Sequence, residues 1–155
     1  MRPAQMAGDA GASGASADSA IPSRPGGSFE LTIASDPAAP CAARAALRAW
    51  MARSPTDPLL TDALMVIGEL VANSVRHARV PADSAIGVHA EMRADILFLE
   101  VADAGTSGAV TPRRPDLTNG GGFGLNVVAT LSRRWGVART PGTRVWAELA
   151  LAPAV

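Results

Sequence analysis

The alternation of apolar and polar residues predicts the main elements of this chain. Apolar residues at every second position indicate half-buried β-strands over Ser28–Ala34, Ala85–Arg93, Ile96–Ala102 and Thr143–Leu151. Helical spacing predicts helices over Ala39–Ala52, over Leu59–Ala78, and from a glycine cluster at 120–124 to Trp135, with a short strand following at Gly136–Arg139. This order predicts an α+β two-layer sandwich, in which a mixed, mostly antiparallel sheet of about five strands is covered on one face by three helices.

The predicted helix Leu59–Ala78 carries a core stripe and a second, mixed face. The stripe consists of Leu60, Leu64, Ile67, Val71, Val75 and Ala78. The opposite face carries polar residues with apolar ones among them: Asp62, Glu69, Asn73, Arg76 and His77, with Met65, Val66 and Leu70. We expect a helix that is apolar nearly all round to be covered on both sides, and its polar groups then need partners from the protein or from a ligand.

Two stretches have no periodic pattern. Residues 1–27 are dominated by Ala, Gly, Ser, Asp and Pro, and we expect a disordered tail because so few apolar side chains cannot offset the entropy of ordering. Residues 28–152 then form one domain. The second stretch, Ser107–Asn119, is polar and contains Arg113 and Arg114, and a loop of this length is usually functional or mobile.

Composition excludes several classes of function. The 14 basic and 14 acidic residues balance, so charge gives no reason to expect direct binding of nucleic acid or of a membrane. The chain contains no lysine, which excludes a P-loop and the lysine-dependent protein-kinase signature. Cys41 is the only cysteine and is expected to be a free, buried thiol. With no uninterrupted apolar run of membrane length and no signal-peptide pattern, we expect a soluble cytoplasmic protein.

Three polar features have residue types that suit a nucleotide. Glu69 and Asn73 share a helix face, where they can hold Mg²⁺ directly or through water, or where Glu69 can act as a general base. Asp103 ends an apolar strand, where its carboxylate can accept a hydrogen bond from the amine of adenine while Gly105 lets the base pack. The cluster Gly120–Gly124 precedes a helix, whose first N–H groups suit phosphate. Each alone has an ordinary explanation, such as a surface glutamate or a tight turn.

In this order the motifs resemble the GHKL (Bergerat-fold) ATPase superfamily. Its N box is similar to Glu69-Leu-Val-Ala-Asn73-Ser-Val-Arg-His77-Ala, its adenine-recognising box to Val101-Ala-Asp103-Ala-Gly105, and its second glycine box to Gly120-Gly-Gly-Phe-Gly124-Leu125. The pattern from Arg134-Trp135 to Trp146-Ala-Glu148-Leu looks like the anti-sigma-factor serine/threonine kinase branch and its ATP-binding relatives. The resemblance covers about Ser28–Leu151 and implies the same two-layer fold.

The resemblance also implies a role for each matched residue. Glu69 would be the general base or water-orienting acid, and Asn73 would be the Mg²⁺ ligand. Asp103 would bond the adenine amine, with Gly105 packing beside it. The phosphates would be approached from the second glycine box, by Gly120, Gly122, Gly124 and Leu125.

Other roles stay open. The loop 106–119 would be the ATP lid, in which Arg113 and Arg114 either contact phosphate or form a solvated pair. His77 either lines the phosphate side or is a helix-end histidine bonded to backbone. Three glycines precede Phe123, so the register of the phosphate contacts is open by one residue.

Two functions follow from the resemblance. The first is an ATP- and Mg²⁺-dependent regulator that phosphorylates a serine or threonine of a partner protein, and sequesters a sigma factor or binds an anti-anti-sigma-like protein. The alternative is a nucleotide-gated interaction module without kinase activity. A histidine kinase or gyrase-like ATPase is less expected, because residues 1–27 predict no helical dimerisation segment and no lysine is available as a phosphate sensor. The amphipathic first strand and the resemblance also suggest a homodimer.

Overall fold

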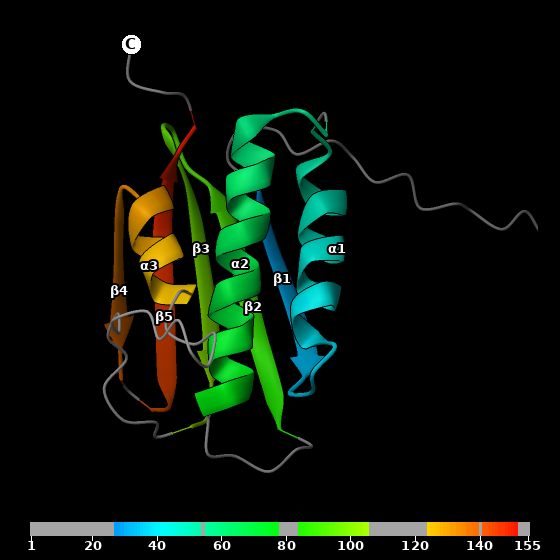
Figure 1. Cartoon of the computed structure of the whole chain (residues 1–155), viewed down its shortest axis with the longest axis vertical. Coiled ribbons are helices and arrows are strands. Elements are labelled where there is room, and N and C mark those ends of the chain that lie inside the picture. The colour runs from blue at the N-terminus through cyan, green and yellow to red at the C-terminus, as the bar shows by residue number, and fades with distance from the viewer. Residues whose placement is uncertain (1–26, 54, 78–83, 106–123, 140, 152–155) are drawn as a thin grey trace, which may run out of the picture.

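The computed structural model describes residues 27–53, 55–77, 84–105, 124–139 and 141–151. The expected tail except Gly27, the loop at 106–119, Gly120 and Gly122 lie outside these residues, as does the side chain of His77. The described chain forms a five-stranded sheet with three helices packed on one face (Figure 1). This arrangement confirms the predicted α+β sandwich.

Every strand pairing in the described sheet is antiparallel. The order across the sheet is β1-β2-β3-β5-β4, so the hairpin β2–β3 and strand β5 lie at its centre. The sequence pattern allowed a mixed sheet, but the described strands include no parallel pair. The element bounds are β1 Ser28–Ala34, α1 Ala39–Met51, α2 Pro58–His77, β2 Ala85–Met92, β3 Ile96–Asp103, α3 Gly124–Leu131, β4 Arg134–Ala138 and β5 Thr143–Ala150.

Helix α3 is shorter than the sequence predicts. It ends at Leu131, and Trp135 lies in β4, opposite Ala147 of β5. The apolar spacing to Trp135 fits a helix, but Trp135 and Val137 also alternate as a strand does, and both pack against the core from β4. Pairing with β5 therefore decides the structure of this segment.

Helix α2 lies between α1 and α3 over the sheet, as Figure 1 shows. Its buried face is rotated from the predicted stripe, because Val66 and Leu70, placed on the opposite face from the sequence, are fully buried. Leu64 and Val75 are only partly buried. By length and composition α2 could cross a membrane, yet more than half of that span is buried in this fold, as in the core helix of a domain.

The two longer helices begin differently. Asp57 precedes α2 and its Oδ1 accepts a hydrogen bond from the N–H of Leu59 at 2.9 Å, which caps the start of the helix. A hydrogen bond from Arg53 holds the pKa of Asp57 below its usual value. Helix α1 has Ala38 at its N-cap and no side-chain cap hydrogen bond, and Asp36, two residues earlier, accepts a hydrogen bond from the N–H of Ala38 at 2.8 Å.

Cys41 is exposed, contrary to the expected buried thiol. The buried positions of α1 follow one another at every fourth residue and leave Cys41 on the outer face: Ala39, Ala43, Leu47 and Met51. Cys41 lies two residues from both Ala39 and Ala43, about half a turn away from this buried stripe.

Glu148 of β5 is a largely buried carboxylate paired with an arginine. Arg134 donates Nε and Nη2 hydrogen bonds of 2.8 and 2.9 Å to its two oxygens, although the side chain of Arg134 is itself exposed. These bonds hold the pKa of Glu148 below its ordinary value and raise that of Arg134. The pair links edge strand β4 to β5.

Candidate functional site

Three chain segments meet at one end of the sheet: the end of β3, the start of β5 and the C-terminal end of α2, all at the lower edge in Figure 1. Helix α3 begins higher up, beside the middle of α2, where Gly124 contacts Glu69. Because the strands are antiparallel, β3 leaves the sheet where β5 enters it, and α2 passes over both. The polar residues singled out from the sequence lie on these segments.

The turn after β3 is held by two buried hydroxyl groups. Ser74 of α2 donates from Oγ to Oδ2 of Asp103 at 2.6 Å, and the N–H of Gly105 donates to Oδ1 at 2.8 Å. Thr143 of β5 donates from Oγ1 to the carbonyl oxygen of Gly105 at 2.9 Å. Ser74 and Thr143 are both 3% exposed, so water competes little for these bonds. The Asp103 carboxylate therefore has one orientation fixed from two sides.

Gly142 closes the same turn from the β5 side. It has a φ of +78°, and a Cβ at this position would overlap the backbone carbonyl oxygen of Asp103. Both the left-handed backbone and the close approach require glycine. The turn at 103–105 is thus fixed by backbone packing as well as by hydrogen bonds.

Glu69 faces the first residue of α3. A Cβ built on Gly124 would overlap Oε2 of Glu69, so the absence of a side chain at Gly124 leaves the room that the carboxylate occupies. Arg76 approaches the same oxygen only to 4.0 Å, and both side chains are partly exposed, so this pair is weak. Leu125 follows Gly124 and is half-buried. The structure therefore brings Glu69 to the N-terminus of α3, where unpaired N–H groups point outward.

Asn73 lies on α2 between Glu69, which faces Gly124, and Ser74, which holds the Asp103 turn. It is half-buried on α2, one turn after Glu69 and directly before Ser74, so a single helix carries all three side chains. Within the described residues, no group of three or more His, Cys, Asp and Glu side chains is arranged to hold a metal ion.

From the predicted set, the structure places Glu69 against Gly124, which Leu125 follows, and Asp103 and Gly105 in one turn against α2, while Asn73 lies on α2 between these two contacts. Gly120 and Gly122 lie outside the described residues. His77 is the last residue of α2, and its side chain is not described.

Three residues of this cluster were not predicted as site residues. These residues are Ser74, Thr143 and Gly142. Ser74 offered a usable signal, because a hydroxyl on the buried face of a core helix needs a partner. Thr143 and Gly142 gave none, since a strand threonine and a turn glycine are common and their contacts with residues 103–105 depend on the strand order.

The comparisons with known proteins agree with this geometry. The family model of the histidine kinase-like ATPase domain matches residues 33–149. The chain therefore belongs to this ATPase family within the GHKL superfamily, and ATP is the nucleotide that such a domain binds. A search of curated proteins finds no match.

Proposed function

We propose that this chain is a regulatory protein that binds Mg·ATP and transfers its γ-phosphoryl group to a serine or threonine of a partner protein, as anti-sigma-factor kinases do. The partner would be a sigma factor or an anti-anti-sigma-like protein. The observation that supports the proposal most directly is the Asp103 turn, fixed by Ser74 and Thr143 beside the helix that carries Glu69 and Asn73.

The Asp103 carboxylate fits the adenine amine. Each of its oxygens already accepts one hydrogen bond, from Ser74 or from Gly105, and an ionised carboxylate has about four acceptor positions. The positions left are acceptors only. They suit the exocyclic amine of adenine and oppose the carbonyl that guanine carries in its place, so the site should prefer ATP over GTP.

The other half of the cluster fits the phosphates. The first N–H groups of α3, at Gly124 and Leu125, suit an anion, and Gly124 lets the backbone approach closely. Asn73 offers an amide oxygen to Mg²⁺, with the remaining ligands coming from phosphates and water because the described residues hold no metal cluster. Bound Mg²⁺ would supply positive charge that offsets the charge of the transferring phosphoryl group.

Glu69 would receive the proton of the attacking hydroxyl. The hydroxyl oxygen of the partner forms a bond to the γ-phosphorus, the bond from that phosphorus to the β–γ bridging oxygen breaks, and ADP leaves. The side chain of Glu69 is 36% exposed, so a partner residue can approach it from outside.

Nucleotide selectivity tests the binding half of the proposal. We expect Mg·ATP to raise the melting temperature and Mg·GTP to leave it nearly unchanged, because a ligand that binds the folded state stabilises it. Asp103→Asn, which replaces one acceptor by a donor, should remove most of the ATP shift. Equal shifts with both nucleotides would contradict the role of Asp103.

Phosphate transfer tests the catalytic half. We expect γ-labelled ATP to label a sigma factor or anti-anti-sigma-like partner, and Glu69→Gln to reduce labelling by about a hundredfold or more while ATP still binds. Binding of ATP without any labelling, unchanged in the variant, would favour the alternative, an interaction module gated by nucleotide.

A further inference from the structure

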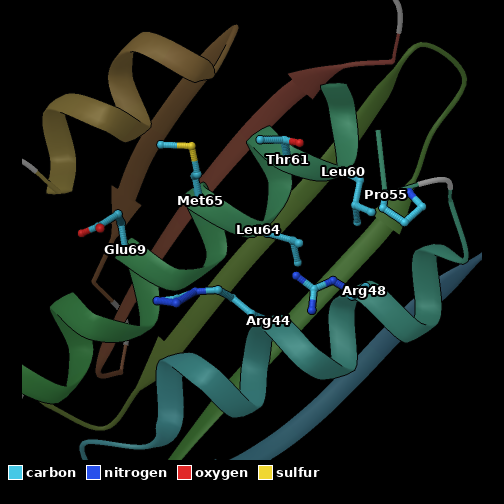
Figure 2. A pocket seen from close by; sticks show the side chains of 8 residues that line it. All are labelled: Arg44, Arg48, Pro55, Leu60, Thr61, Leu64, Met65 and Glu69. Carbon is cyan, nitrogen blue, oxygen red and sulfur yellow. The ribbon is translucent and has the colours of Figure 1, made fainter. Parts of the chain in front are cut away.

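A groove of about 660 Å³ runs along the outer side of α1 and α2, away from the sheet. Helix α2 provides its floor and α1 one wall, and Pro55 lies at one end (Figure 2). The apolar part of its lining comes from Pro55, Leu60, Leu64 and Met65. Met65 is 47% exposed and is the one large apolar side chain among the described residues that is exposed to this degree. An apolar strip is therefore left open on this surface.

Two arginines border this strip. Arg44 and Arg48 lie one helical turn apart on α1 and, as Figure 2 shows, both reach from α1 toward α2. Neither forms an ion pair or hydrogen bond within the described part of the chain. Arg44 packs closely against α2 at Gly68, where an added Cβ would lie 2.5 Å from its Nε. Two guanidinium groups without carboxylate partners thus lie beside the exposed apolar strip.

We propose that this groove is a docking site for an acidic, amphipathic helix of a partner protein. Carboxylates four residues apart on a helix have the spacing of Arg44 and Arg48, about 6 Å along the axis. Such a helix can pair its carboxylates with both guanidinium groups and place its apolar face over Leu64 and Met65. Methionine adapts its shape to a docked surface, which suits this position.

Charge complementarity favours a partner protein as the occupant of the groove over the undescribed segments of this chain. Residues 1–26 contain Asp9 and Asp18 with two arginines, and residues 106–123 contain one acid, Asp116, beside Arg113 and Arg114. Neither segment offers two carboxylates at helical spacing. Glu69 at the far end of the groove would repel an acidic residue there, so the carboxylates of the occupant must face α1.

The test uses synthetic peptides and the full chain without nucleotide, so its result does not depend on the proposed ATP site. The probe is a fluorescein-labelled helical peptide of about 14 residues with two glutamates at i and i+4 and leucines on the adjoining face; its counterpart has lysines in place of the glutamates. Fluorescence anisotropy measures binding, and amide chemical shifts locate it. We expect the acidic peptide to bind and the lysine peptide not to bind, with changes in the amide chemical shifts of residues 44–48 and 60–69.

Substitutions distinguish binding in the groove from nonspecific attraction between the peptide and positive charge elsewhere on the protein. Arg44→Ala with Arg48→Ala should weaken binding by about tenfold or more, whereas Arg93→Ala with Arg144→Ala, which removes the same charge from the sheet side, should change it less than about twofold. Met65→Glu, at an exposed position that folding tolerates, should also abolish binding.

Three results would overturn the proposal. They are no binding up to about 1 mM peptide, equal binding of the lysine peptide, and binding that survives the Arg44/Arg48 double substitution. Equally strong shifts from N-acetylglutamate alone would also overturn it, because they would make the groove a site for small anions.

Discussion

Removal of the Ser74 hydroxyl tests whether Asp103 works through its orientation. Ser74→Ala deletes a 2.6 Å hydrogen bond to a carboxylate, a short bond of the charge-assisted kind. Because Asp103 is only half-buried, water partly replaces the lost donor, and we expect a loss of about 1–2 kcal/mol in the free energy of unfolding. The carboxylate is then held from one side only, by Gly105, and ATP affinity should fall by about five- to tenfold.

The assay combines urea unfolding with isothermal titration of Mg·ATP and Mg·GTP. A merely structural serine would lower stability and leave both affinities in the same ratio, whereas an orienting serine lowers the preference for ATP. Ser132→Ala is the matched control, since the hydroxyl of Ser132 is buried without a hydrogen-bond partner and its removal should cost almost nothing. The reasoning is refuted if Ser74→Ala loses stability as expected but binds ATP as tightly and as selectively as the unchanged chain.

Three further substitutions have outcomes that the structure defines. Gly142→Ala should cost about 2–3 kcal/mol in urea unfolding, because the left-handed backbone and the overlap with the β3 turn both resist a side chain; a loss below about 0.5 kcal/mol would contradict this. Gly124→Ala should leave stability within about 1 kcal/mol yet displace Glu69 and weaken Mg·ATP binding by about tenfold in titration; unchanged affinity would show that this carboxylate position is unimportant. Glu148→Gln should cost about 1 kcal/mol at pH 7. The pKa of Glu148 is depressed in the fold, so its stabilising contribution is complete above its ordinary value of 4.5 and is lost as pH falls below that. The stabilities of both forms in urea melts should therefore converge as pH falls below 4.5, and a constant difference would argue against the ion pair.

The sequence was sufficient for the fold because local pattern and tertiary packing agree over most of the chain. The strand Ser28–Ala34 has the predicted bounds, and the other predicted strands that alternate end within one residue of them. The pattern was ambiguous at Trp135, which fits a helix and a strand equally, and only the pairing of β4 with β5 decides between them. On α2 the predicted stripe was rotated because apolar residues occur nearly all round the helix and give periodicity little contrast.

The sequence singled out three polar side chains of the candidate site but not the residues that contact them. Glu69, Asn73 and Asp103 stand out because polar groups in apolar elements need partners. The contacts of Glu69 with Gly124, of Asp103 with Ser74 and of Gly105 with Thr143 join residues far apart in the chain, and no local spacing encodes them. The roles assigned to all the predicted site residues stay predictions, and Gly120, Gly122 and the side chain of His77 lie outside the described residues.

Helix α2 belongs both to the core and to the candidate site, and this has a consequence for local unfolding. Its inner face supplies core residues such as Ile67 and Leu70, while its C-terminal half carries Glu69, Asn73 and Ser74. A helix in contact with both neighbouring helices and the central strands cannot detach alone, so its amides should exchange with solvent deuterium only through global unfolding. Nucleotide bound to this end should then slow hydrogen exchange across the whole core, far beyond the residues it contacts.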